Sequence, residues 1–236
     1  MNDLNINWKD FYKNVFSLVV PMALQNLINV GVTAADVVML GKVSEKVLSG
    51  ASLAGQIQYI MVLFLFGLTS GATVLTAQYW GKGDKTTIEK ILALGIRSAV
   101  IVTAIFTVAA FAIPASLMRI FTNDPQVIAE GVKYLRIVAC SYIIMGITNV
   151  YLYVMRSIER VIVATVVYLV SFLCNVIFNA IFIFGLFGFP ALGIRGAAIA
   201  TLIARIVELI LVCGYAKIYN KDVKFRVHYF LHQDKL

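Results

Sequence analysis

The sequence predicts an all-α integral membrane protein with six transmembrane helices. Of its 236 residues, 61% are hydrophobic and 14% are charged, and the mean hydropathy of +0.88 lies far above that of soluble domains. Six stretches are long enough and poor enough in charge to cross a bilayer, which takes about 20 apolar residues in a helix. The basic residues gather in alternate connections, as expected when successive loops lie on opposite sides of a membrane.

The six predicted helices follow from these stretches and from the residues that interrupt them. Pro21 lies inside the first helix, where we expect a kink whose freed carbonyl is satisfied by neighbouring helices. The turn Gly81–Asp84 separates the second helix from the third. Pro114 and then Thr122–Pro125 break the chain before the fourth, and the Gly-rich segment Gly185–Gly196 connects the last two. The predicted ranges are about Asn14–Gly41, Val47–Tyr79, Glu89–Ile113, Gln126–Met155, Val161–Phe187 and Gly196–Tyr219.

The distribution of charge predicts how the helices are oriented. Connections on the side of the N-terminus hold most of the 20 Lys and Arg residues, and cytoplasmic loops carry such an excess. We therefore expect a multi-pass protein of the plasma (inner) membrane with both termini cytoplasmic. Residues 1–13 form the cytoplasmic N-terminus, 14–219 the six-helix transmembrane unit and 220–236 a basic cytoplasmic tail. The net charge of +8 follows this topology, so it indicates contact with membrane lipid and no nucleic-acid partner.

No motif of an enzyme is present. The sequence lacks an HExxH motif, a P-loop, a nucleophile elbow and any paired Cys/His set, so we expect no catalytic residues and no cofactor. Cys140, Cys174 and Cys213 occur singly in apolar stretches and are expected to be small buried residues.

Small residues indicate where helices approach each other closely. Gly67 and Gly71 have GxxxG spacing in the second helix, and a run of Gly and Ala from Gly193 to Ala200 opens the sixth. Such residues let two backbones come together in a membrane. Close helix packing is therefore expected at both places.

Asp36 is the strongest candidate for a functional residue. A carboxylate inside a bilayer costs about 2.5–3.5 kcal/mol on insertion scales, and such residues mark ion, proton or substrate paths. At 1.5 Å per residue, Asp36 lies roughly 7 Å from the outer end of its helix. Asn175, Asn179 and Thr201 fall in the same shell of the outer half, while Asn29 lies two turns deeper on about the same face as Asp36.

This polar cluster is compatible with three chemical roles. Hard oxygen ligands suit Na⁺, which would bind at Asp36, Asn175 and Asn179. Burial also favours the protonated form of a carboxylate, so the coupling ion could equally be H⁺. The alternative is that these side chains join helices by hydrogen bonds worth about 0.6 kcal/mol each.

Arg205 and Glu208 form a second polar feature. They are three residues apart on the sixth helix, so they share a face and are expected to form a buried ion pair. Such a pair lowers the cost of burying both charges. A structural role and a role in substrate binding or coupling both remain open.

Several fragments of the sequence resemble the multidrug and toxic compound extrusion (MATE) family. Each matching fragment is short, but their order and spacing together are specific and span nearly the whole chain. The fragments are Pro21, Asp36–Gly41, Gly67–Gly71, Ala77–Asp84, Asn175 with Asn179, and Gly193–Thr201.

The resemblance implies one lobe of a MATE-like two-lobe transporter. In that family two six-helix lobes face each other around a central cavity, and cation uptake drives the export of cationic, amphipathic drugs. Asp36 would then be the coupling carboxylate of the N-terminal lobe, with Asn175, Asn179, Thr201 and Asn29 as its network. Some relatives carry a second carboxylate where this chain has Asn179, which argues against a mechanism that needs two acidic groups in this lobe.

The length leaves two arrangements open. Six helices are half the number expected for the family, so the second lobe is either the C-terminal half of a longer protein or a second copy of the chain. In the first case, residues 220–236 resemble the linker between lobes. Two other functions also fit the sequence: a flippase of lipids or lipid-linked oligosaccharides from the same superfamily, and a non-transporting membrane scaffold.

Overall fold

The structure, a computed structural model, describes residues 8–220, 222, 223 and 229, and it confirms the all-α fold. Six helical segments in this part of the chain are long and apolar enough to cross a membrane. Residues 1–7 of the predicted N-terminal segment and most of the predicted basic tail lie outside the described residues. The helices are α1 (Trp8–Gly41), α2 (Glu45–Gly81), α3 (Lys85–Ala112), α4 (Pro114–Arg119), α5 (Pro125–Val138), α6 (Tyr142–Ser157), α7 (Val161–Phe184) and α8 (Ile194–Ile218).

Several helix boundaries differ from the sequence prediction. The first helix begins at Trp8, six residues before the predicted Asn14, so residues 8–13 of the predicted N-terminal segment are helical. The predicted fourth helix is divided into two helices, α5 and α6, by a 3₁₀ turn at Ala139–Ser141. Pro114 does not only end α3: it also begins the short helix α4, where its missing N–H costs nothing. The prediction that the fifth helix reaches Phe187 was wrong, because α7 ends at Phe184. The next residue, Gly185, adopts a left-handed conformation with φ 72° that terminates the helix.

The first helix is continuous through Pro21, and α7 supports it there. The Thr165 hydroxyl donates to the Pro21 carbonyl at 3.5 Å. One turn further along α1, the buried Gln25 amide donates to Thr165 Oγ1 at 2.7 Å and to the Val161 carbonyl at 3.2 Å. Polar side chains therefore join α1 to α7 near the end of the bundle where both helices begin.

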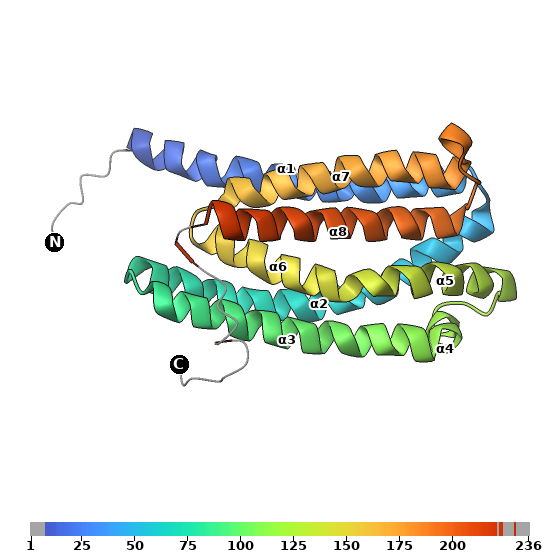
Figure 1. Ribbon diagram of the computed structural model, residues 1–236, viewed down its shortest axis with the longest axis horizontal. Coiled ribbons are helices and arrows are strands. Elements are labelled where there is room, and N and C mark those ends of the chain that lie inside the picture. Colours follow the sequence, from blue (N-terminus) through green and yellow to red (C-terminus); the bar gives the residue numbers. More distant parts are fainter. Residues whose placement is uncertain (1–7, 221, 224–228, 230–236) are drawn as a thin grey trace.

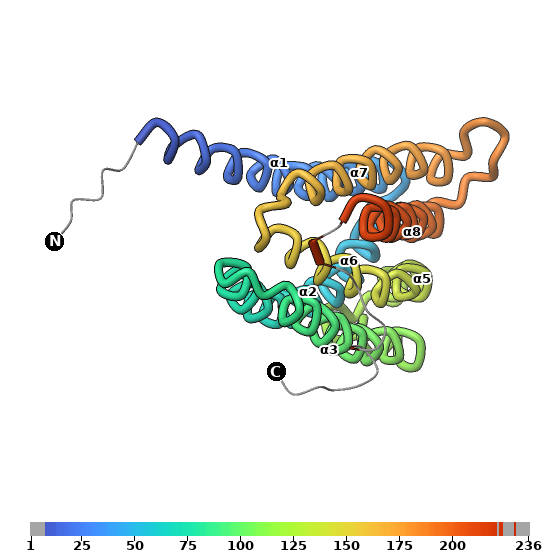
Figure 2. Tube along the Cα trace, turned by 60° about the vertical axis from the view of Figure 1, so that its left-hand side comes forward, coloured from blue at the N-terminus to red at the C-terminus, as the bar shows by residue number. Residues whose placement is uncertain are grey.

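The helices form two groups (Figures 1 and 2). In both views α1, α7 and α8 lie together, and α2, α3, α5 and α6 form the second group. Contacts of α5 and α6 with α8 join the two. One end of the bundle contains the start of α1, the α2–α3 turn, the α6–α7 turn and the end of α8. We call it the inner end, and we call the opposite end the outer end.

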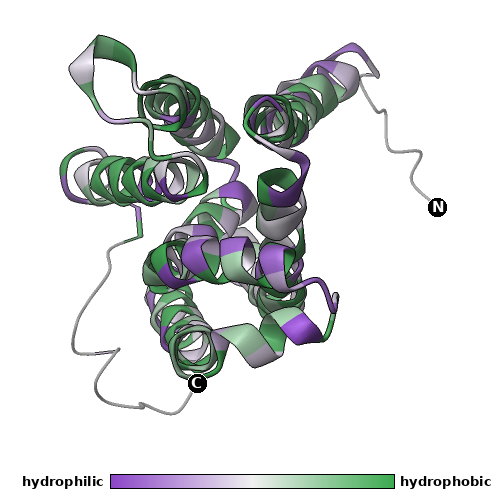
Figure 3. Cartoon of the chain, turned by 90° about the vertical axis from the view of Figure 1, so that its right-hand side faces the viewer, coloured by the Kyte–Doolittle hydropathy of each residue, from purple (hydrophilic) through white to green (hydrophobic). Residues whose placement is uncertain are grey.

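Hydrophobic residues cover most of each long helix (Figure 3), including sides with no protein neighbour. Large exposed side chains such as Phe16, Ile105 and Val108 would be costly in water but suit contact with lipid. Cys140 and Cys213 belong to this exposed surface, so the prediction that the cysteines are buried was wrong for both.

The prediction of close packing at Gly67 and Gly71 was also wrong within this bundle. Both glycines are exposed, and a Cβ atom added at either position would meet no atom within 4 Å. The prediction for the start of the sixth helix is confirmed, because Gly196 is buried against the backbone of α7. Spacing alone does not say which side of a helix has a neighbour.

The chain just after α8 is fastened to the inner end of the bundle. Asp222 accepts from Lys85 Nζ at 2.8 Å and from Arg160 Nη2 at 2.9 Å, so it connects the starts of α3 and α7. Asn220 is buried and donates to the Tyr151 hydroxyl at 2.9 Å, while its own side-chain oxygen accepts from the backbone N–H groups of Asp222 and Val223. We call Asn220, Asp222 and Val223 the Asp222 clamp.

We expect Asp222→Asn to lower the thermal unfolding midpoint of the purified protein by about 2 to 4 °C at neutral pH. Lys85 and Arg160 hold the pKa of the Asp222 carboxyl below its usual value. Its contribution to stability is therefore complete above the unfolded pKa of about 4 and is lost as the pH falls through the lower folded value. The difference between the variant and the parent protein should accordingly shrink on acidification below about pH 4. Glu159→Gln, which removes an exposed carboxylate at the same end, is the control; an equal loss in both variants would contradict a specific clamp.

Candidate functional site

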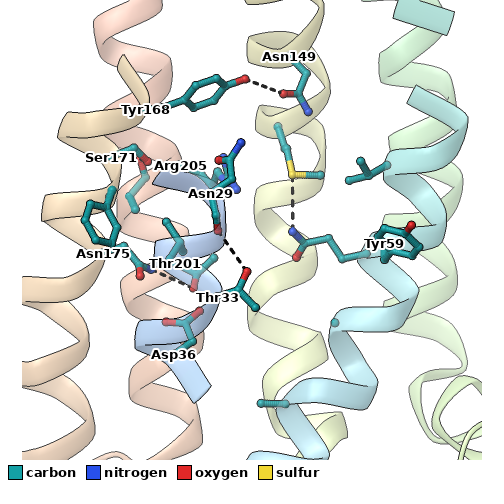
Figure 4. A pocket seen from close by; sticks show the side chains of 18 of the residues that line it. Asn29, Thr33, Asp36, Tyr59, Asn149, Tyr168, Ser171, Asn175, Thr201 and Arg205 are labelled. Atoms are coloured by element: carbon teal, nitrogen blue, oxygen red, sulfur yellow. Dashed lines mark hydrogen bonds between the residues drawn. The ribbon is translucent and has the colours of Figure 1, made fainter. Parts of the chain in front are cut away.

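A cavity of about 780 Å³ lies between the two helix groups and is lined by α1, α2, α5, α6, α7 and α8. Its walls combine apolar side chains with polar groups at two levels (Figure 4). Asp36 and Asn175 lie toward the outer level, Tyr168 and Asn149 lie toward the inner one, and Arg205 lies between them. The volume is typical of sites that hold drug-sized molecules.

The outer level is a chain of hydrogen bonds that starts at Asp36. The Asn179 amide donates to Asp36 Oδ1 at 2.5 Å and to Asn175 Oδ1 at 3.0 Å. The Asn175 amide in turn donates to the Thr201 hydroxyl at 3.4 Å. The structure thus brings together Asp36 from α1, both asparagines from α7 and Thr201 from α8.

The packing of α7 against α8 brings these groups together. Asn175 and Asn179 are one turn apart on the buried face of α7, and both side chains are almost fully buried. At Gly196 the two backbones approach so closely that an added Cβ atom would lie 2.5 Å from the Phe182 carbonyl oxygen. Thr201 follows little more than one turn later on α8, within reach of Asn175.

Asn179 has a side-chain oxygen that no other described residue engages. Both of its amide hydrogens are engaged, and its Oδ1 is buried without a hydrogen-bond partner. Leaving a buried acceptor unpaired costs about 1–3 kcal/mol. This oxygen belongs to the same amide group that donates to Asp36, so it could accept a hydrogen bond or bind a cation next to the carboxylate.

Asn29 has no hydrogen bond to this chain within the described part of the structure, so its place in the network stays a prediction. Its side chain lies on the cavity wall near Arg205 (Figure 4), and its backbone carbonyl accepts from the Thr33 hydroxyl at 3.3 Å. Asn29 and Asp36 are seven residues apart, or about 10 Å along the helix. They share a face of α1 but not a depth in the bilayer.

The predicted ion pair between Arg205 and Glu208 is present. Arg205 Nη1 donates to Glu208 Oε2 at 2.6 Å, and the Thr148 hydroxyl of α6 donates to Glu208 Oε1 at 2.6 Å. Glu208 is fully buried, whereas Arg205 lines the cavity with its side chain 24% exposed. Glu208 therefore fixes one edge of the Arg205 guanidinium while the remainder faces the cavity.

Several cavity residues were missed by sequence reasoning, among them Tyr134, Asn149, Arg156 and Tyr168. Tyr134 of α5 is buried beside Thr201, close enough to Asp36 for an electrostatic interaction. Tyr168 of α7 donates to Asn149 Oδ1 of α6 at 3.4 Å. Arg156 lines the inner level although it lies in the last turn of α6, where sequence analysis placed it in a connection.

Comparison with known proteins agrees with the fold and with the resemblance seen in the sequence. A protein named as a probable multidrug resistance protein NorM from Thermotoga maritima is 28% identical over 200 residues, which is 83% of this chain and 42% of that protein. A probable NorM of Rhizobium meliloti is 26% identical over 211 residues, 89% of this chain and 45% of its own length. The chain thus spans less than half the length of these relatives.

Solved structures show the same arrangement of helices. An outward-facing multidrug resistance transporter of the MATE family matches with a TM-score of 0.82 at 20% identity, over 92% of this chain and 48% of that one. A transporter of the MOP superfamily from Pyrococcus furiosus matches equally well, with a TM-score of 0.82 and 19% identity over the same shares.

The family model MatE matches residues 21–181, which include the helices that carry Asp36, Asn175 and Asn179. Members of this family are multi-pass membrane transporters and not enzymes. The match covers well over half of the chain and agrees with the six-helix fold, so the chain belongs to the MatE family.

Proposed function

We propose that this chain forms the N-terminal lobe of a cation-coupled antiporter that exports cationic or amphipathic drugs and toxic compounds by alternating access. Asp36 is the carboxylate that takes up the coupling ion. The observation that carries the proposal is the position of Asp36 on the cavity wall, hydrogen-bonded to Asn179 and so to Asn175 and Thr201. One site can then respond to both ion and substrate.

The balance of charge supports a cation at Asp36. Within the described residues Asp36 has no ion pair, and Arg205, a cavity cation, is already engaged by Glu208. A carboxylate in this setting is stabilised by Na⁺ or H⁺ from outside the protein. The unused Asn179 oxygen supplies a further ligand for Na⁺ or an acceptor for a protonated carboxyl group.

The second lobe completes the path. We propose that it comes from the C-terminal half of a longer polypeptide or from a second copy of this chain, with the cavity between the lobes. We propose from the excess of Lys and Arg in the connections at the inner end that this end faces the cytoplasm and that the protein resides in the plasma (inner) membrane.

Transport by the protein in liposomes tests the proposal. Export of a fluorescent organic cation is measured with a Na⁺ gradient and a pH gradient imposed separately. We expect at least one gradient to drive export and an ionophore that dissipates it to stop export. A substrate flux that neither gradient alters would contradict ion coupling.

Lipid translocation is the second candidate function. It is favoured by the two guanidinium groups, of Arg156 and Arg205, in the cavity lining, because anionic headgroups need such partners. Scrambling of fluorescent lipids between the leaflets of the same liposomes, without an ion gradient, would favour this candidate over drug export.

A further inference from the structure

We propose that the part of the cavity between Arg156 at the inner level and Arg205 at the middle is a binding subsite for an anionic group. Its ligand is an amphiphile that carries a carboxylate or phosphate in addition to any cationic group. The proposal deepens the export function proposed above and rests on it for the identity of the transported molecule, but the subsite itself is a property of binding.

Arg156 is held in place without being neutralised. Its guanidinium carbon lies 4.7 Å from the centre of the Tyr153 ring and 5.8 Å from that of Tyr168, both within the range of a cation–π contact. Among the described residues, its buried Nε has no hydrogen-bond partner and no carboxylate pairs with its guanidinium group. Two aromatic rings thus orient a guanidinium group that lines the cavity.

Arg205 is held by different contacts. One guanidinium nitrogen donates to Glu208, which Thr148 fixes from the other side. An arginine has five N–H donors, so the pair with Glu208 leaves others available. Because Arg205 lines the cavity and Glu208 does not, the positive end of the pair faces the space and the negative end lies behind it.

The charges on the cavity wall therefore have a fixed arrangement. The charged residues that line it in the described part of the chain are Asp36, Arg156 and Arg205. The Tyr168 ring centre lies 5.8 Å from the Arg156 guanidinium carbon, whereas Asp36 lies at the opposite level, beyond Arg205 (Figure 4). Guanidinium groups bind carboxylate and phosphate with paired, charge-assisted hydrogen bonds. A zwitterionic amphiphile can place its cationic part toward Asp36 and its anionic part toward the arginines.

The position of Arg156 at the inner end does not by itself account for these contacts. Cytoplasmic ends of membrane helices are rich in basic residues, and most such side chains extend to headgroups and water. Arg160, four residues further along, behaves in this way: its side chain is 55% exposed and pairs with Asp222. Arg156 instead turns into the cavity between two tyrosines.

Two dyes that differ at one group test the subsite. Rhodamine 110 carries a free carboxylate, and rhodamine 123 is its methyl ester, so the pair isolates the anionic group. Binding of each dye to the purified protein in nanodiscs of neutral lipid is followed by fluorescence anisotropy. We expect Arg156→Gln to weaken the binding of rhodamine 110 about tenfold and to leave that of rhodamine 123 unchanged.

The role of Arg205 needs a paired change, because Arg205→Gln alone would leave Glu208 buried without its partner. The double variant R205Q/E208Q removes both charges, and we expect it to weaken rhodamine 110 binding selectively as Arg156→Gln does. Arg97→Gln, which removes an exposed guanidinium on α3 outside the cavity lining, is the control and should bind both dyes normally. Parental affinity for rhodamine 110 in R156Q and R205Q/E208Q, or equal losses for the two dyes, would overturn the subsite.

A second arm distinguishes the source of the anionic group. In nanodiscs that contain phosphatidylglycerol, a lipid headgroup that occupies the subsite would weaken rhodamine 110 binding to the parent protein but not to R156Q. Without such competition, the subsite serves molecules that enter from solution. Both arms measure binding and not transport. Selective loss of rhodamine 110 binding in the variants, in a protein without gradient-driven export, would retain the subsite and reject the export function. Gradient-driven export without such a selective loss would retain the export function and reject the subsite.

Discussion

Replacing Asp36 by asparagine is expected to reduce gradient-driven export to the level of liposomes that contain no protein. Asparagine has nearly the same shape and can still accept from the Asn179 amide, but it cannot bind a proton or neutralise Na⁺. The measurement is the initial rate of dye export under an imposed Na⁺ or pH gradient. Because the change removes a charge that is costly in the bilayer, the thermal unfolding midpoint should be unchanged or higher.

The control is Glu45→Gln, which removes an exposed carboxylate at the outer end but outside the cavity. It should export at the parental rate. If Asp36→Asn kept full gradient-driven export, the ion would bind elsewhere and the hydrogen-bonded chain of Asp36, Asn179, Asn175 and Thr201 would be helix-joining polar contacts only.

The second large effect is expected for Gly196→Ala. The added methyl group would lie 2.5 Å from the carbonyl oxygen of Phe182 and 2.9 Å from the backbone nitrogen of Ile183, so α8 must move away from α7. Overpacking against side chains costs about 1–3 kcal/mol, and backbone atoms yield less, so we expect a cost near the upper end. A loss of about 3 kcal/mol corresponds to a decrease of about 6 to 12 °C in the unfolding midpoint of a protein of this size.

The same displacement should also weaken ion binding, because the Asn175–Thr201 hydrogen bond crosses from α7 to α8. Gly214→Ala is the matched control: Gly214 lies in the same helix, and its added Cβ atom would meet nothing within 4 Å. It should be neutral or slightly stabilising, since alanine favours helix over glycine. Similar midpoints for the two variants would show that the close approach at Gly196 relaxes without cost.

Depth along each helix could be predicted from the sequence, but rotation about each helix could not. The rise of 1.5 Å per residue placed Asp36, Asn175, Asn179 and Thr201 in one shell, and the structure joins these four by hydrogen bonds. The direction in which a side chain points depends on which neighbours surround the helix. For this reason the packing expected at Gly67 was wrong, although the same argument from small residues is confirmed in α8.

The arginines illustrate a second reason. Arg205 was found because Glu208 follows three residues later on the same helix, a local pattern. Arg156 also has a carboxylate three residues later, Glu159, but α6 ends at Ser157, and no ion pair joins the two among the described residues. The contacts of Arg156 come instead from Tyr153 on its own helix and from Tyr168 on the next. Signals that depend on tertiary contacts become visible only in the assembled bundle.

The depth of Asp36 also bears on how the membrane potential acts on ion uptake. Asp36 is five residues from the end of α1 at Gly41, or about 7 Å along a bilayer core of roughly 30 Å. An ion that arrives from that end crosses about a quarter of the electric field, and moving one charge through the whole field is worth about 2.3 kcal/mol per 100 mV. Binding at Asp36 would gain only about 0.5 kcal/mol at 100 mV. The occupancy of this carboxylate should therefore follow the ion concentration on that side far more closely than the voltage.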